Sequence, residues 1–205
     1  LYQGTKAFEL LTGRDAPLAA MRTAVYSDVG KSRGKGVSLI GFMGAGKSTV
    51  AKALAMRLGL PAIDTDADIE RESGMTINEI FGKRGEAAFR MLETKRIARL
   101  SRSRPTVVAS GGGSVLDEKN VRALRANGTV VLLWTGGGTL KKRLAGNGGR
   151  PLLAGRGKAM GSEGLRKLLR ERTPIYLDSA DIVVDADASP ASIAGVIAFE
   201  ARDAG

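Results

Sequence analysis

The sequence predicts an α/β fold in which helices cover both faces of a parallel β-sheet. From residue 37 onward, short apolar segments rich in β-branched residues alternate with longer segments of helical periodicity. This alternation is typical of a doubly wound parallel sheet. In addition, a glycine-rich turn at residues 41–48 joins the first apolar segment to the first helical one, and turns of this kind bind phosphate groups in such folds.

Five segments are expected to form strands, because each is short, apolar and β-branched: residues 37–41, 61–64, 106–110, 129–134 and 182–185. Helices are expected between them, at residues 48–58, 77–81, 86–100, 118–126, 139–144, 163–179 and 190–201. The glycine run at residues 136–138 leads us to expect that the helix after it is short or starts late. Residues 146–161 are glycine-rich and basic, which is typical of a lid loop over an active site.

Composition excludes several kinds of chemistry. The 205 residues include no His and no Cys, which excludes disulfides, Cys- or His-ligated zinc and nucleophilic catalysis that depends on His. Acid–base work must fall to Asp, Glu, Lys or Tyr, and any metal is expected to be a hard cation such as Mg²⁺. No apolar run reaches membrane-spanning length, and no signal-peptide pattern follows Leu1. We therefore expect a cytoplasmic protein that does not bind membranes.

The net charge of +11 indicates an anionic partner. Residues 101–172 contain the whole excess of basic residues. Aromatic residues make up only 4% of the chain, too few for the stacking platforms of proteins that bind single-stranded nucleic acid. We expect arginines of this region to bind phosphate or carboxylate groups of small molecules, and we expect no nucleic-acid partner.

Residues 41–48 (GFMGAGKS) match the pattern G-x-x-x-x-G-K-[ST], with the strand before it and the helix after it that the pattern requires. Backbone amides of such a turn surround phosphate oxygens, the lysine reaches the β- and γ-phosphates, and the serine ligates Mg²⁺. A purely structural glycine turn is the alternative, but the complete match favours nucleotide binding. The residues expected to bind ATP here are Gly44, Ala45, Gly46, Lys47, Ser48 and Thr49.

Other polar motifs follow later strands. Asp64 and Asp66 end the second strand, where ligands of such sheets bind. One carboxylate there can hold Mg²⁺ through water, and the other can accept a proton from a hydroxyl. Arg90 and Glu93 lie one turn apart on a predicted helix, a spacing that usually gives only a surface ion pair. The glycines at residues 111–113 follow the third strand and allow the backbone to approach a ligand closely.

The order of these motifs resembles that of the shikimate kinase family. In chain order they read G-x-x-G-x-G-K-S, D-T-D, F-R-x-x-E, G-G-G, R-P-L-L and R-x-P-x-Y, between about residues 37 and 197. The resemblance implies a P-loop kinase of the nucleoside-monophosphate-kinase type, with a five-stranded parallel sheet, a lid and a substrate-binding subdomain. It also implies transfer of the ATP γ-phosphoryl group to the 3-hydroxyl of shikimate, on the route to chorismate and the aromatic amino acids.

The same resemblance assigns roles around shikimate. Asp66 matches the aspartate at the shikimate hydroxyls and is the implied proton acceptor. Arg90 and Arg172 match the arginines that bind the shikimate carboxylate, and Glu93 matches the residue that orients Arg90. The glycines that line the substrate in the family correspond to Gly111, Gly112 and Gly113.

The resemblance also assigns roles around ATP. Lys47 and Arg150 are implied to be catalytic, and Arg150 matches the lid arginine that closes on the phosphates. Arg143 matches the arginine that covers the adenine, although the preceding glycine run departs from the family pattern. Asp64 matches a carboxylate in the water shell of Mg²⁺, so Ser48 and Asp64 are the implied metal residues.

Residues 1–36 precede the kinase-like part. The segments Gln3-Gly4, Phe8-Glu9 and Thr12-Gly13 resemble the C-terminal helices of shikimate dehydrogenase. The resemblance implies either a fragment of a dehydrogenase–kinase fusion or a kinase with a dehydrogenase remnant, and a chance pair of amphipathic helices is the alternative. We expect an extension and linker, poorly ordered or only helical, followed by a kinase domain at residues 37–205.

Two other functions remain open: an effector-binding module of a transcriptional regulator, and another small-molecule P-loop kinase. The chain has Lys47, Asp66, Arg90 and Arg172 but no helix-turn-helix before the linker, which weighs against the regulator. The other kinase would not explain the arginine pair together with the three glycines. We expect a monomer that uses shikimate and ATP, with fusion to or association with a shikimate dehydrogenase domain left open.

Overall fold

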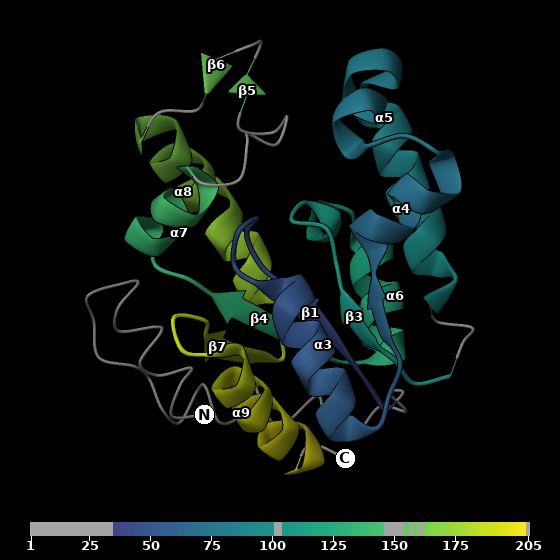
Figure 1. The fold of residues 1–205 in the computed structure, drawn as a ribbon, viewed down its shortest axis with the longest axis vertical. Helices are drawn as coiled ribbons and strands as arrows, with labels where there is room; N and C mark the ends of the chain where they lie inside the picture. Colours follow the sequence, from purple (N-terminus) through teal and green to yellow (C-terminus); the bar gives the residue numbers. More distant parts are fainter. Residues whose placement is uncertain (1–34, 101–103, 146–153, 156–157, 160–161, 204–205) are drawn as a thin grey trace.

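The computed structural model describes residues 35–100, 104–145, 154–155, 158–159 and 162–203. Five of the strands form one sheet in the order β2-β3-β1-β4-β7, and every pair in it is parallel (Figure 1). These strands are β1 (Gly36–Ile40), β2 (Ala62–Asp64), β3 (Val107–Ala109), β4 (Gly128–Trp134) and β7 (Ile182–Asp185). The predicted five-stranded parallel sheet is confirmed.

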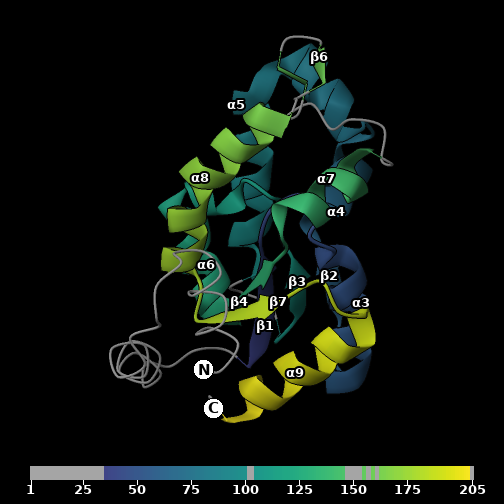
Figure 2. The same cartoon turned by 90° about the vertical axis from the view of Figure 1, so that its left-hand side faces the viewer.

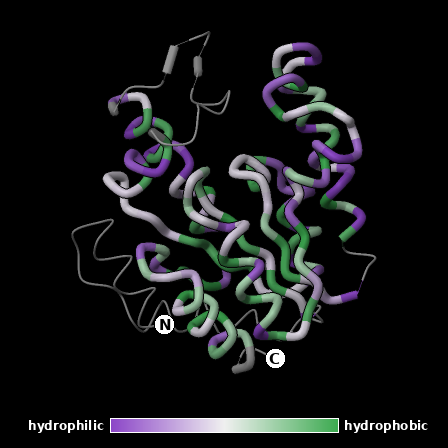
Figure 3. The backbone as a smooth tube through the Cα atoms, viewed as in Figure 1, coloured by the Kyte–Doolittle hydropathy of each residue, from purple (hydrophilic) through white to green (hydrophobic). Residues whose placement is uncertain are grey.

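Helices cover both faces of the sheet, as Figure 2 shows. On one face lie α3 (Lys47–Leu58) and α9 (Pro190–Asp203). The other face is covered by α6 (Glu118–Asn127), α8 (Ser162–Ser179) and the end of α5 (Ile77–Ala98). The strands are apolar along most of their length (Figure 3), as burial on both faces requires.

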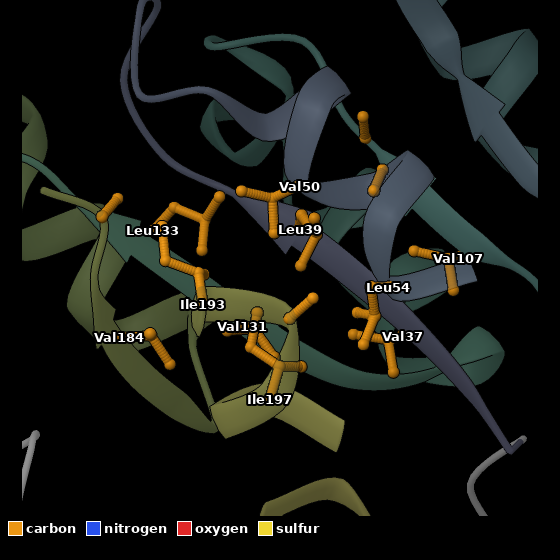
Figure 4. Packing of buried hydrophobic residues seen from close by; sticks show 14 of the residues in the cluster. Val37, Leu39, Val50, Leu54, Val107, Val131, Leu133, Val184, Ile193 and Ile197 are labelled. Atoms are coloured by element: carbon orange, nitrogen blue, oxygen red, sulfur yellow. The ribbon is translucent and has the colours of Figure 1, made fainter. Parts of the chain in front are cut away.

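Alternation along each strand divides the core into two clusters. Val37 and Leu39 of β1 pack against α3 and α9, whereas Ile40 belongs to the cluster on the opposite face. In β4, Val131 and Leu133 join the first of these clusters (Figure 4). Because the two clusters hold the strands rigidly, the carboxyl ends of the strands form a fixed edge on which a site can be built.

Helix α4 (Thr65–Ser73) was not predicted. It begins where it does because the Asp64 side chain accepts hydrogen bonds from the backbone N–H groups of Asp66 (3.0 Å) and Ala67 (3.2 Å), which is an N-cap. Its sequence, TDADIERES, contains few apolar residues. The helix therefore lacks the periodic apolar stripe on which the prediction relied.

Helix α5 joins the two helices predicted between residues 77 and 100, and it ends at Ala98, two residues before the predicted end. They are separated at Gly85, whose backbone has φ 79° and ψ 169°, a conformation essentially restricted to glycine. Helices α4 and α5 share a small apolar cluster of their own, formed by Ile69, Ile80 and Phe89. They form a unit beside the carboxyl edge of the sheet (Figure 1).

The expectation for the helix after the Gly136–Gly138 run was wrong. Helix α7 spans Gly137–Ala145 and starts inside the run, two residues before the predicted start. Leu140 explains the early start, because it is 1% exposed and its N–H donates to the Gly136 carbonyl at 3.0 Å. Burial of one leucine thus outweighs the low helix propensity of the glycines.

Three short elements were also not predicted: the 3₁₀ helix η2 (Ser114–Leu116) and the antiparallel strands β5 (Ala154–Gly155) and β6 (Lys158–Ala159). Most of the predicted lid, residues 146–161, lies outside the described residues, as does the predicted helical pattern before residue 35. None of the described helices is both long and apolar enough to cross a membrane.

Candidate active site

The turn between β1 and α3 has the conformation of a phosphate-binding loop. Gly44 and Gly46 have φ values of 81° and 91°, which glycine adopts readily and other residues rarely do. Gly46 is also the N-cap of α3, and within the described chain no side chain caps this helix. Its first N–H groups thus suit an anion. The Lys47 ammonium donates to the carbonyls of Gly41 (2.7 Å) and Phe42 (3.0 Å) and lies along the loop.

A cleft of about 570 Å³ includes this loop in its wall. All of the described residues that were predicted to contact ATP or Mg²⁺ line it, together with Asp66. Sequence reasoning missed Ser110, Lys142 and the turn between β7 and α9, where Ala186, Ala188 and Pro190 complete the wall. The turn could have been predicted from its position, because it follows the carboxyl end of a strand, where ligands of such sheets bind.

Arg143 joins two walls of the cleft. Its Nη1 donates to the carbonyl of Gly44 at 3.3 Å, and its Nη2 donates to the carbonyl of Ala186 at 3.2 Å. Helix α7 therefore carries Arg143 to the phosphate loop in spite of the glycine run that precedes it. Arg150, the other arginine predicted to act on ATP, lies outside the described residues.

Ser48 and Asp64 provide oxygen atoms for a cation in this cleft. Asp64 uses Oδ1 for both of its cap hydrogen bonds, so its second oxygen takes part in neither. Among the described residues, no group of three or more acidic side chains could hold a metal alone. This donor set fits Mg²⁺, which keeps several waters and takes further ligands from phosphates.

A smaller pocket adjoins the cleft and contains the predicted acceptor residues except Arg172. It is lined by Met43, Asp66, Ile77, Phe81, Phe89, Arg90, Glu93, Gly111, Gly112 and Gly113. Asp66 and Met43 line both the pocket and the cleft. Asp66 therefore lies at the junction, where a group could pass from a donor in the cleft to an acceptor in the pocket.

Arg90 is held from several sides. Its Nη1 lies 2.7 Å from Oε2 of Glu93, and its Nη2 lies 3.1 Å from Oε1 of Glu86. The guanidinium also lies over the Phe89 ring, 5.3 Å from its centroid. The Glu93 side chain is 0% exposed, so the expectation of an ordinary surface ion pair does not hold. The Arg90 side chain is 24% exposed, and a guanidinium paired with two carboxylates has a defined orientation, as carboxylate recognition requires.

Arg172 of α8 lies close enough to Glu93 and Tyr176 for its charge to lower the pKa of each. Burial raises the pKa of Glu93, Arg90 lowers it, Asp66 raises it and Arg172 lowers it again. Burial also raises the pKa of Tyr176, against a nearby Arg172 that lowers it. Burial lowers the pKa of Arg90, but the neighbouring carboxylates outweigh this and raise it. Within the described chain, Oε1 of Glu93 and Nη1 of Arg172 are buried and have no hydrogen-bond partner.

The glycines after β3 leave room for these charged groups. A Cβ at Gly113 would lie 2.5 Å from Nη1 of Arg90. A Cβ at Gly111 would lie less than 3.0 Å from a carboxylate oxygen of Glu93 and from one of Asp66. Such distances are too short for non-bonded atoms, so only glycine allows the charged side chains to pack against this loop.

Two residues without a predicted role hold the glycine loop in place. The N–H of Gly111 donates to Oγ1 of Thr65 at 3.0 Å, and the hydroxyl of Tyr176 donates to the carbonyl of Gly112. Thr65 is 0% exposed. The D-T-D and R-x-P-x-Y motifs contain these residues, but nothing in the motifs shows that they contact the loop.

A parallel sheet, a phosphate-binding loop and an adjoining pocket with paired charges define a P-loop kinase of small molecules. A deoxyadenosine kinase from M. mycoides, 15% identical, shares this fold with a TM-score of 0.52 over 82% of this chain and 98% of its own. The family model "Shikimate kinase" matches residues 43–200. The chain belongs to the shikimate kinase family.

Individual relatives agree with this membership. The chain is 45% identical to a shikimate kinase of Thermobifida fusca over 168 residues, which is 82% of this chain and 95% of that protein. It is 40% identical to one of Moorella thermoacetica over 82% of this chain and 92% of that protein. The solved shikimate kinase from Acinetobacter baumannii in complex with shikimate is 34% identical, with a TM-score of 0.76 over 82% of this chain and 93% of its own. The model "Shikimate 5'-dehydrogenase C-terminal domain" matches residues 1–26, which confirms the resemblance at the N-terminus.

Proposed function

We propose that this chain transfers the γ-phosphoryl group of ATP to the 3-hydroxyl of shikimate. The observation that carries the proposal is that Arg90, paired with the buried Glu93, lines the same pocket as Asp66, which lies at the junction of the pocket and the cleft. Membership of the shikimate kinase family supports it, as does the similar structure solved with shikimate. The regulator module and the other small-molecule kinase are not favoured.

The arginines account for the acceptor being an acid. Planar guanidinium groups bind a carboxylate with paired, charge-assisted hydrogen bonds. Arg90 is oriented for this by Glu93, and Arg172 reaches the same cluster from α8. With the carboxylate bound there, the ring hydroxyls extend toward Asp66. Its carboxylate takes the proton of the 3-hydroxyl while that oxygen bonds to the γ-phosphorus, and the bond from the γ-phosphorus to the bridging oxygen of ADP breaks.

The cleft holds the donor. Lys47 and the N-terminus of α3 offset the charge of the phosphates, and Arg150 of the lid is proposed to add a further positive charge. Arg143 and the turn between β7 and α9 are proposed to hold the adenine. Mg²⁺, held by Ser48 and through water by Asp64, would supply charge neutralisation at the β- and γ-phosphates.

We further propose that residues 37–205 form the kinase domain and residues 1–36 an extension from a dehydrogenase-related segment. We also propose that the protein acts as a monomer. Light scattering during size-exclusion chromatography tests this, and a stable dimer would contradict it.

The test is ADP release by the purified chain with ATP and Mg²⁺, in the presence of shikimate or of hydroxylated acceptors that lack a carboxylate. We expect release only with shikimate, and a product whose phosphorus NMR signal couples to the proton at carbon 3. Release that is independent of shikimate, or none with shikimate, would refute the proposal.

Asp66→Asn tests the proton acceptor. It should leave the ATP KM unchanged and lower kcat by about 10²-fold or more, the usual contribution of a general base. Asp178→Asn is the matched control, because Asp178 is exposed on α8 and lines neither the pocket nor the cleft within the described chain. A kcat for Asp66→Asn equal to that of the control would remove Asp66 from this role.

A further inference from the structure

Helices α4 and α5 are joined by a largely buried ion pair that has no part in the roles described so far. Arg96 donates to Oδ2 of Asp68 from Nε (2.8 Å) and from Nη2 (2.5 Å). The side chains of Arg96 and Asp68 are only 12% and 11% exposed. Arg71 donates to the other oxygen, Oδ1, at 2.5 Å. Asp68, Arg71 and Arg96 are not among the described residues that line the pocket or the cleft.

The pair lies close in the chain to both halves of the acceptor site. Asp68 follows Asp66 by two residues on α4, and Arg96 follows Glu93 by three residues, or one turn, on α5. The proton acceptor is thus carried by α4, and the group that orients Arg90 is carried by α5. The distance between Asp66 and Arg90 is therefore set by how α4 and α5 are held together.

Few other polar contacts hold that spacing, and one of them, from the N–H of Ile77 to Oε1 of Glu70 at 2.9 Å, lies before the break in α5 at Gly85. The apolar cluster between the two helices has three buried residues within the described chain, and four partly buried ones pack against them: Met75, Ile77, Phe81 and Leu92. Of the buried residues, Ile80 precedes the break at Gly85 and therefore belongs to the part of α5 that does not carry Arg90. A second ion pair, Arg99 with Glu72, also joins α4 to α5 at 3.0 Å, but its side chains are 52% and 48% exposed. Exposed pairs of this kind contribute little.

We propose that Asp68 and Arg96 are positioning residues of the acceptor site, which set the distance between the proton acceptor Asp66 and the carboxylate-binding Arg90. The inference rests on the proposed function, because Asp66 and Arg90 then contact opposite ends of one small molecule. A displacement of α5 against α4 by about 1 Å would disturb both contacts, and errors of this size cost orders of magnitude in rate. The phosphate loop belongs to β1 and α3, so ATP binding should not depend on the pair.

Arg96→Gln tests the proposal. It removes the charge and the second hydrogen bond but leaves Asp68 paired with Arg71, so the chain keeps one partner for the buried carboxylate. We expect a rise of about tenfold or more in the KM for shikimate and a lower kcat, with the ATP KM unchanged. Arg99→Gln is the matched control, because it breaks the exposed pair between the same two helices, and it should have parent kinetics. Arg96→Lys should lie between, since an ammonium can reach Asp68 but makes no forked contact.

Three outcomes would overturn the inference while the parent enzyme is active on shikimate. One is a parent-like shikimate KM for Arg96→Gln, and another is an equal effect of Arg99→Gln. The third is a fall in kcat alone with both KM values unchanged, because that indicates a smaller folded fraction and a merely structural pair. If Arg96→Gln is unfolded at the assay temperature, Arg96→Lys provides the same comparison. A parent chain without shikimate-dependent ADP release would instead refute the proposed function, and this inference with it.

Discussion

A single methyl group at Gly113 tests whether the position of Arg90 determines acceptor binding. Gly113 has φ −112° and ψ 3°, which other residues can adopt, so alanine there adds no left-handed backbone strain. The new Cβ would lie 2.5 Å from Nη1, 2.6 Å from Nη2 and 2.8 Å from Cζ of Arg90. Gly113→Ala is therefore a steric change directed at one guanidinium.

The size of the effect follows from these distances. Ordinary contact begins at 3.4 Å, so the guanidinium must retreat by about 1 Å to restore van der Waals contact. It is held at 2.7 Å by Glu93 and at 3.1 Å by Glu86, and retreat must break or bend these contacts. A hydrogen bond to a charged group contributes about 1.5–3 kcal/mol, which corresponds to roughly 10- to 100-fold in affinity. We expect the shikimate KM to rise by that factor and the ATP KM to stay constant.

The assay is ADP release against shikimate at saturating ATP, and then the converse. Gly82→Ala is the matched control, because Gly82 lies on α5 and a Cβ there would meet nothing within 4 Å. It should keep parent KM values and raise the free energy of unfolding by up to about 1 kcal/mol. A parent-like shikimate KM for Gly113→Ala would show that Arg90 can relax without loss, and would refute the steric argument.

Three further predictions concern single side chains. Burial raises the pKa of Glu93, so its stabilising contribution is present below 4.5, the ordinary glutamate value, and is lost as pH rises through the folded pKa. In urea unfolding, the free energy of unfolding of Glu93→Gln should therefore rise relative to that of the parent as pH increases above 4.5. A difference between the two that does not depend on pH would contradict this. Tyr176→Phe leaves the Gly112 carbonyl without its donor, so it should cost about 1–3 kcal/mol in thermal unfolding, and an unchanged Tm would contradict this. Arg143→Ala should raise the ATP KM but not the shikimate KM in the same ADP assay, and the reverse pattern would place Arg143 elsewhere.

The sheet and the phosphate loop could be predicted because both are local in sequence. Each strand shows its own apolar run, and the loop shows its glycines next to Lys47 and Ser48. Neither depends on a residue far along the chain. Helix α4 could not be predicted in this way, because its apolar content is small and it is stabilised by the Asp64 cap and by the contact of Asp68 with Arg96.

The burial of Glu93 could not be predicted either. A spacing of three residues between an arginine and a glutamate is the same on an exposed helix face and on a buried one. What buries Glu93 is the loop at Gly111, which comes from another element and approaches only because it has no side chain. The resemblance to a family identified Glu93, Arg90 and the glycines as a set, and the structure supplies the physical reason why they occur together.

The cleft and the pocket should respond differently to substitutions, because different parts of the fold hold them. The cleft is built on strands that two large apolar clusters hold, so single substitutions in the α4–α5 unit, other than at Asp66, should leave it intact. The pocket depends on that unit, on a glycine loop and on Tyr176 of α8, which are linked by a few polar contacts. Affinity for the acceptor is therefore the property that substitutions at Asp68, Arg96 or Gly113 should alter first, while affinity for ATP persists.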